Sequence, residues 1–135
     1  MQVNAQTSPI VIIGMHRTGT SMLTRMLEQL GLFCGWRKQG DHEALLFLGL
    51  NDWILEQAHG SWDHPETLPE LLAEPKVRGL VRDHLEFTLA SPRRLSFLGP
   101  RLSLQHGSVG ELDGPWGWKD PRTTFTLPLW LELSR

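Results

Sequence analysis

The first clear pattern along the chain is a continuous apolar run, Ile10–Ile13, that leads into a loop containing glycine. Runs of this kind are typical of strands buried on both faces of a parallel sheet. From Ser21 on, apolar residues recur at helical spacing until Gly31, which suits the position just after a helix C-terminus. These apolar positions are Met22, Leu23, Met26, Leu27 and Leu30. The opening therefore predicts a strand, a glycine loop and a helix.

Three further segments follow before the next strand-like stretch. Ala44–Ala58 has a helical pattern, and Glu66–Ala90 is also predicted to be helical with a break at Pro75. Ser91–Gly114 is rich in Gly, Pro, Ser and Arg and has weak periodicity, so we expect a loop there.

The last part of the chain predicts a short strand and a final helix. The strand lies in "WGWKDPR", Trp116–Arg122, and the helix covers Thr123–Leu133, where Pro128 is expected to kink or interrupt it. Strands followed by helices indicate an α/β fold with a parallel sheet. Only two or three strands can be assigned, whereas such sheets normally have four or more. We therefore expect an incomplete sheet in the N-terminal part of a longer protein.

Composition places the chain among soluble globular proteins. Its 135 residues suit one domain, 40% are hydrophobic and 21% are charged. No apolar run has the roughly 18–20 residues needed to span a bilayer. The N-terminal "MQVNAQTS" lacks the basic and apolar regions of a signal peptide, and Cys34 is the single cysteine. We expect a cytoplasmic protein without an internal disulfide.

Charge is unevenly distributed around a net value of −2. Residues 1–40 carry four basic side chains and one acidic one, and this basic cluster coincides with the glycine loop. Residues 41–74 carry eight acidic side chains and no basic one, which predicts a solvated helix face. No continuous basic stripe exists to follow a phosphate backbone, so we expect a compact anion and no nucleic acid.

The loop has the spacing Gly14-x-x-x-x-Gly19-Thr20-Ser21. This is the phosphate-loop pattern with threonine in the position of the usual lysine. Glycines allow successive backbone N–H groups to turn toward one centre, and the N-terminus of the following helix favours an anion there. A plain strand-to-helix turn is the alternative, with glycine serving only the turn.

Polar side chains in and after this loop favour anion binding over a plain turn. Arg17 can supply the charge of the missing lysine through a planar fork of donors, and His16 can add a second donor. The hydroxyls that can donate to anionic oxygens are those of Thr18, Thr20 and Ser21.

Three segments in order resemble the bacterial-type sulfotransferases. "IVIIGMHRTGTSML" is similar to their 5′-phosphosulfate-binding loop, "EALLFLGLNDWIL" at Glu43–Leu55 to their intervening helix, and "WGWKDPR" to their second recurrent segment. The resemblance runs from Pro9 to about Leu133. It implies a three-layer P-loop-like fold, with residues 1–135 as a single domain truncated before the 3′-phosphate-binding segment. We therefore expect a fragment, a truncated reading frame or a degenerate copy.

The resemblance implies transfer of a sulfuryl group from 3′-phosphoadenosine 5′-phosphosulfate (PAPS) to a hydroxyl or amine. The co-substrate would be held by the loop, at Gly14, His16, Arg17, Thr18, Gly19, Thr20 and Ser21. Arg17 and Lys119 would stabilise charge on the leaving phosphate, Glu43 would take the acceptor's proton, and no metal is expected. Other interpretations remain: Glu43 as a solvated helix residue, and Lys119 as a partner of an acidic neighbour.

Other residues have simpler interpretations. Asp120 is interpreted as a helix cap rather than a catalytic group. Trp116 and Trp118 could stack on a base or sugar, but core positions are favoured. Cys34 is interpreted as a small buried residue. The histidines lack metal-ligand spacing and are assigned to the surface; they are His42, His59, His64, His84 and His106.

Two competing functions stay open at this point. A small P-loop nucleotide kinase would use Ser21 as the Mg²⁺-binding hydroxyl, although Thr20 replaces its lysine. An inactive remnant would bind only an anion, a nucleotide or a partner chain. The acceptor is open among small molecules, glycans, lipids and proteins, and the open sheet edge predicts self-association.

Overall fold

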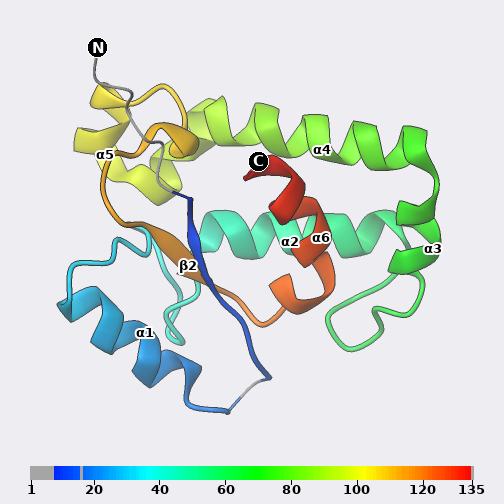
Figure 1. The fold of residues 1–135 in the computed structure, drawn as a ribbon, viewed down its shortest axis with the longest axis horizontal. Helices are drawn as coiled ribbons and strands as arrows, with labels where there is room; N and C mark the ends of the chain where they lie inside the picture. The colour runs from blue at the N-terminus through cyan, green and yellow to red at the C-terminus, as the bar shows by residue number, and fades with distance from the viewer. Residues whose placement is uncertain (1–7, 16, 135) are drawn as a thin grey trace.

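A computed structural model describes residues 8–15 and 17–134 of the chain. Two short parallel strands, β1 (Ile10–Ile12) and β2 (Gly117–Lys119), lie among helices (Figure 1). The α-helices are α1 (Thr20–Gln29), α2 (Leu45–Gln57), α3 (Leu68–Ala73), α4 (Pro75–Ala90), α5 (Leu95–Gln105) and α6 (Thr123–Leu133). Short 3₁₀ turns, η1 (Pro92–Arg94) and η2 (Val109–Glu111), flank α5. The described part is thus a mixed helical arrangement with a small parallel sheet, which agrees with the predicted α/β class.

The two strands pair although most of the chain separates them in sequence. Ile10 lies opposite Gly117, Val11 opposite Trp118 and Ile12 opposite Lys119. A Cβ atom on Gly117 would lie 1.8 Å from the carbonyl oxygen of Ile10, so only glycine allows this approach. Because the strands are parallel, the loops that follow them leave the same edge of the sheet.

The prediction that Ile10–Ile13 is buried on both faces along its whole length is wrong. Ile12 is 5% exposed, but Ile10 and Ile13 are 47% and 41% exposed. Ile12 belongs to a small core cluster against which Leu27 of α1 packs, whereas Val11 packs against the larger core that holds α2 and α6. The faces of β1 are therefore covered at Val11 and Ile12, and the strand is open to solvent at Ile10.

An aromatic cluster forms the centre of the larger core. Phe47 of α2 stacks on Trp118 of β2, with ring centroids 4.0 Å apart, and contacts Trp130 of α6 edge to face. Trp116 and Trp118 are 5% and 1% exposed, so their predicted core position is confirmed. This cluster fixes α2 and α6 against β2 and thereby orients the loop between β2 and α6.

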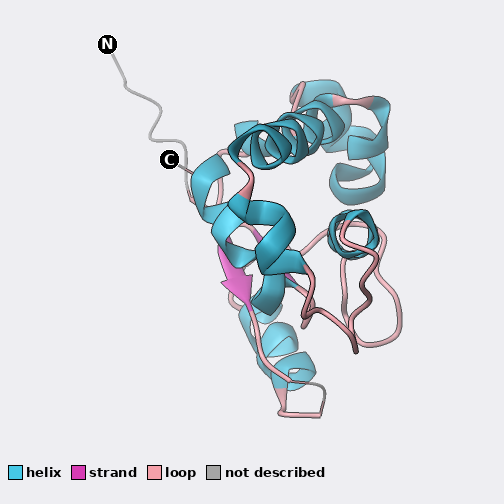
Figure 2. Ribbon diagram, turned by 90° about the vertical axis from the view of Figure 1, so that its right-hand side faces the viewer, coloured by secondary structure: helices cyan, strands magenta, loops and turns pink. Residues whose placement is uncertain are grey.

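Most of the predicted helices are present, with one correction. α1, α2 and the α3–α4 pair broken just before Pro75 match the sequence pattern. The loop predicted for Ser91–Gly114 is wrong, because α5 lies within it. Gly99, with φ 76°, breaks the helical backbone immediately before Pro100 and hides the periodicity. Figure 2 shows how helices dominate the molecule around the strands.

Two helices differ from expectation in detail. Pro128 does not interrupt α6, which is continuous from Thr123 to Leu133. The apolar face predicted for α1 is largely open to solvent: Met22, Met26 and Leu30 are 67%, 55% and 83% exposed. No helix in residues 8–15 and 17–134 is long and apolar enough to cross a membrane.

Candidate functional site

A cleft of about 960 Å³ lies where the loops after β1 and β2 meet. Its β1 side is lined by the loop and the start of α1, including Arg17, Gly19, Thr20 and Ser21. Its β2 side is lined by Lys119 and Arg122. The carboxyl ends of parallel strands are where α/β proteins commonly bind ligands. The cleft therefore brings together the two polar segments that the sequence singled out.

The loop presents the N-terminus of α1 to the cleft. Gly19 is the N-cap residue with φ 87°, and α1 has no side-chain cap. A left-handed backbone at this position is natural for glycine, and uncapped N–H groups at a helix start suit an anion. Arg17 is exposed and also has a left-handed backbone, with φ 62°. Non-glycine residues in this region are uncommon and cluster at functional sites.

The predicted loop donors are not all directed to the cleft. The Thr18 hydroxyl donates to the carbonyl of Met15 at 2.8 Å, within the loop itself. Thr20 and Ser21 line the cleft, and the Ser21 hydroxyl donates to the carbonyl of Asp41 at 3.2 Å. Gly14 follows β1 and does not line the cleft. His16 lies outside the described residues.

Arg25 belongs to the cleft, although its place one turn into the helix suggests otherwise. It lines the same cavity, and its Nε atom donates to His42 Nε2 at 2.8 Å. In residues 8–15 and 17–134, no carboxylate pairs with Arg17. On the loop side of the cleft, the charge of Arg17 is therefore not paired with a carboxylate of the described residues.

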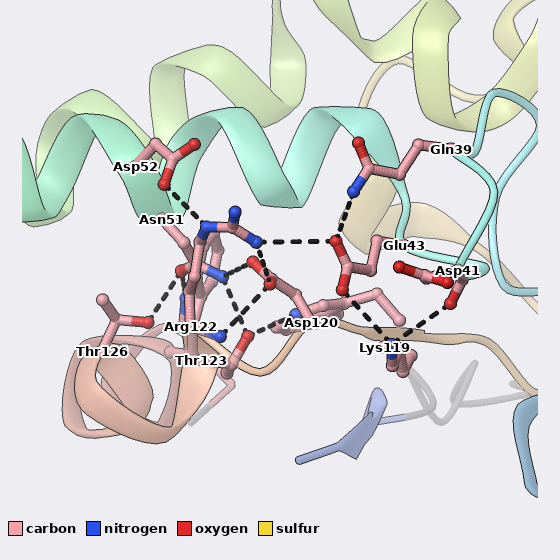
Figure 3. Close-up of polar contacts among 12 residues, drawn as sticks. Gln39, Asp41, Glu43, Asn51, Asp52, Lys119, Asp120, Arg122, Thr123 and Thr126 are labelled. Atoms are coloured by element: carbon pink, nitrogen blue, oxygen red, sulfur yellow. Dashed lines mark hydrogen bonds and ion pairs between the residues drawn. The ribbon is translucent and has the colours of Figure 1, made fainter. Parts of the chain in front are cut away.

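Lys119 is held at the opposite wall. Its side chain comes from the last residue of β2 and is 3% exposed as a residue. Its Nζ donates to Glu43 Oε1 and to the Asp41 carbonyl, both at 3.2 Å (Figure 3). Ser21 and Lys119 thus share one carbonyl oxygen, which links the two walls.

Glu43 lies behind Lys119 and is 1% exposed, so the solvated helix position considered for it is wrong. Its Oε2 accepts a hydrogen bond from Gln39 at 2.7 Å and lies 3.5 Å from Arg122 Nη1. It does not line the cleft. This arrangement favours a role in positioning Lys119, and the general-base role stays a prediction.

Arg122 is a further cleft residue, and the local sequence pattern does not indicate it. Its guanidinium contacts Asp52 at 2.7 Å, Asp120 at 3.0 Å and Glu43 at 3.5 Å (Figure 3). Burial lowers the pKa of Arg122, but Asp120, Asp52 and Glu43 together outweigh burial and raise it above the ordinary value. Asp52 and Glu43 are far from Arg122 in sequence, so local patterns gave no signal of this cluster.

Asn51 of α2 fixes the turn that carries Arg122. Its amide nitrogen donates to Asp120 at 2.8 Å and to Thr123 at 2.9 Å. Its amide oxygen accepts from the Thr126 hydroxyl and the Trp130 indole. All four hydrogen-bonding positions of the amide are therefore used.

Asp120 is itself 0% exposed and accepts the Arg122 backbone N–H at 3.2 Å. This hydrogen bond closes the turn before α6, but Asp120 lies two residues ahead of the N-cap residue, Arg122, so it is not itself the helix cap. Asp120 also holds the Arg122 side chain, so it supports the cleft wall as well as the turn.

The two walls differ in net charge. Lys119 and Arg122 face three carboxylates, those of Glu43, Asp52 and Asp120, which compensate their charge. Arg17 and the uncapped amides of α1 lack such compensation within the described residues. An anion is therefore attracted mainly to the loop side, and the β2 side offers rigid, oriented donors.

No group of three or more His, Cys, Asp or Glu side chains in residues 8–15 and 17–134 is arranged to hold a metal ion. Comparisons with protein-family models, with curated proteins and with solved structures find no match to this chain.

Proposed function

We propose that the chain binds the 5′-phosphosulfate of PAPS in this cleft and belongs to a PAPS-dependent sulfotransferase. The observation that carries the proposal is the convergence of the Arg17–Ser21 loop and Lys119 on one cavity. They belong to two of the three segments that carry the sequence resemblance, and they are about 100 residues apart. The same convergence supports a P-loop-like arrangement of strand, glycine loop and helix.

The residues fit a compact anion with two groups of donors. On one side, the α1 amides and Arg17 provide positive potential, and no carboxylate of the part of the chain that the structure describes pairs with Arg17. Lys119, fixed by Glu43 and the Asp41 carbonyl, provides a donor whose position is already set on the other side. Donors fixed in advance stabilise charge without reorganisation, which is the main requirement where a phosphate departs.

PAPS supplies the sulfuryl group: its bond to the 5′-phosphate oxygen breaks, a bond to the acceptor oxygen or nitrogen forms, and the acceptor's proton passes to a base, either Glu43 or water. In the proposed roles, Arg17 and Lys119 stabilise the negative charge on the departing phosphate. Glu43 holds Lys119 in place through the 3.2 Å contact. A Glu43→Gln variant decides whether Glu43 also takes the acceptor's proton.

Binding of 3′-phosphoadenosine 5′-phosphate (PAP) and PAPS, measured by isothermal titration calorimetry, tests the proposal. Arg17→Ala should weaken both by roughly tenfold or more, as expected when a charged hydrogen-bond partner is lost. Arg101→Ala is the matched control, because Arg101 is exposed on α5 and does not line the cleft.

Titration of ATP with and without Mg²⁺ addresses the kinase alternative. Tight ATP binding that requires Mg²⁺, together with weak PAP binding, would favour a kinase. Equal losses for Arg17→Ala and Arg101→Ala would show a general basic surface and overturn the proposal. Arg25 is unsuitable as a control, because it lines the cleft.

A further inference from the structure

A second cavity, of about 360 Å³, adjoins the cleft. The two cavities share Met15, Trp62 and Arg122 in their linings. The remaining lining comes from the segment after α2, from the turn before α6 and from the start of α6: Asp63, Pro65, Pro121, Thr124 and Phe125. A molecule in this cavity would therefore lie directly beside an anion held in the cleft.

The walls of this cavity are mainly apolar. Its lining includes the aromatic residues Trp62 and Phe125, which are 50% and 36% exposed, and two prolines. Aromatic and proline surfaces favour a ligand with a planar apolar body. The volume is near the lower end of ordinary ligand pockets, roughly 300–1,000 Å³, which suits one or two rings.

Few polar groups in this cavity are available to a ligand. Arg122 is already paired with three carboxylates, and among the described residues of the lining the other side chains with polar atoms are Asp63, Thr124 and the indole of Trp62. A hydroxyl that leaves water without finding a partner costs free energy. For a polyol, the free-energy cost of removing many hydroxyls from water would therefore exceed the gain from binding in this cavity. A ligand with one hydroxyl would not have this cost.

The charge at the rim disfavours an anionic ligand. The Ser61 hydroxyl donates to Asp63 Oδ1 at 2.5 Å. This hydrogen bond lowers the pKa of Asp63, so the group is a carboxylate at neutral pH. An acidic group on the ligand would meet this negative charge.

From these features, we infer that the cavity is the acceptor site and takes a neutral one- or two-ring alcohol or phenol, its hydroxyl directed to the cleft. The acceptor role rests on the proposed function. The preference for a neutral planar ligand over a polyol or an anion depends only on the cavity itself.

Three probes of contrasting chemistry separate these preferences: 2-naphthol, 6-hydroxy-2-naphthoate and methyl glucoside. Their binding to the full chain is measured by calorimetry in the absence of nucleotide, and PAP binding is measured separately. Phe125→Ala should weaken 2-naphthol binding by roughly tenfold, because one large apolar contact is lost. PAP binding should not change, since Phe125 does not line the cleft.

A variant that removes the charge of Asp63 at the exposed rim tests the preference for a neutral over an anionic ligand. Asp63→Asn should reduce the ratio of the affinities for 2-naphthol and 6-hydroxy-2-naphthoate by roughly two- to fivefold, the range expected for one exposed charge. Circular dichroism of both variants verifies that they are folded.

These experiments separate the ligand preference of the cavity from the proposed sulfotransferase function. Binding of 2-naphthol that depends on Phe125 supports the ligand preference even if PAP fails to bind, in which case only the sulfotransferase assignment is lost. Two results would overturn the inference, whether or not PAP binds. One is that methyl glucoside binds as tightly as 2-naphthol; the other is that Phe125→Ala leaves the affinity for 2-naphthol unchanged.

Discussion

Lys119 Nζ lies 3.2 Å from Glu43 Oε1, and both side chains are almost completely removed from solvent. The two residues are 76 positions apart and come from the end of β2 and the segment before α2. Leaving one charge of a buried pair without its partner is costly, because the remaining ion has neither water nor a counter-charge. This pair therefore has consequences for both stability and binding.

Removing the Glu43 carboxylate should destabilise the protein. We expect Glu43→Ala to lower the free energy of unfolding by about 3–5 kcal/mol, the usual cost of breaking a buried ion pair. Urea denaturation followed by circular dichroism measures this difference. Asp113→Ala, at an exposed position, is the control and should change stability by less than about 0.5 kcal/mol. A loss from Glu43→Ala as small as the control's would contradict the burial argument.

The isosteric variant Glu43→Gln separates the two roles considered for Glu43. If the carboxylate positions Lys119, the variant should weaken PAP binding severalfold. If it is a general base, PAP affinity should remain and transfer should fall by about 10²–10⁴-fold. PAP titration combined with a transfer assay on the same preparation gives the answer. We expect the first result, because Glu43 does not line the cleft.

Gly117 should tolerate no side chain. Gly117→Ala places a methyl group 1.8 Å from the Ile10 carbonyl oxygen and must separate β1 from β2. Thermal unfolding should show a loss of several degrees or no folded protein. Gly79→Ala is the matched control, because Gly79 lies in α4 and a methyl group there would have nothing within 4 Å. Alanine at this position should stabilise the helix by about 0.5–1 kcal/mol. Similar behaviour of both variants would contradict the strand pairing.

Asn51 should be sensitive to the smallest change in its side chain. Asn51→Asp replaces two amide donors with carboxylate oxygen and places it 2.8 Å from Asp120 Oδ2. We expect a loss of about 3–5 kcal/mol in the free energy of unfolding, since a charge is buried without a partner. Gln57→Glu, on the exposed end of α2, makes the same chemical change and should be nearly neutral. Urea denaturation at pH 7 compares the two, and equal effects would argue against the buried network.

Cys34 should make the fold sensitive to alkali. Burial, followed by the nearby Glu28 charge, raises the pKa of the Cys34 thiol from 9.0 to about 11. The thiol form is favoured in the folded state, so its contribution to stability is full below pH 9 and is lost as the pH rises toward 11. The difference in stability between the wild type and Cys34→Ala should therefore shrink over this interval. If the difference in stability between the wild type and Cys34→Ala stays constant from pH 9 to 11, the raised pKa of the Cys34 thiol is contradicted.

Local patterns predicted the elements better than the contacts between them. The strand, glycine loop and first helix were evident from apolar spacing, and Pro75 marked the boundary between α3 and α4. α5 was missed because Gly99 and Pro100 interrupt its pattern from within. The exposed apolar face of α1 shows that spacing reveals amphipathicity but not what covers it.

The candidate site was predictable only in its individual segments. Arg17, Ser21 and Lys119 were identified from motif spacing and resemblance, and the structure brings them to one cleft. The ion pairs around Arg122 and the hydrogen bonds of Asn51 depend on residues about 70 positions apart, which meet only when α2 packs on α6. Glu43 was identified by resemblance, but its burial follows from the tertiary fold alone.

The peptide group at Asp41 joins two walls of the cleft through a single oxygen, which accepts hydrogen bonds from both Ser21 and Lys119. A bound anion that recruits either donor must alter the bonding of this carbonyl, whichever side it approaches from. A ¹³C label at the Asp41 carbonyl would thus act as an internal reporter of occupancy. Its chemical shift would register ligand arrival at either wall without any probe attached to the ligand.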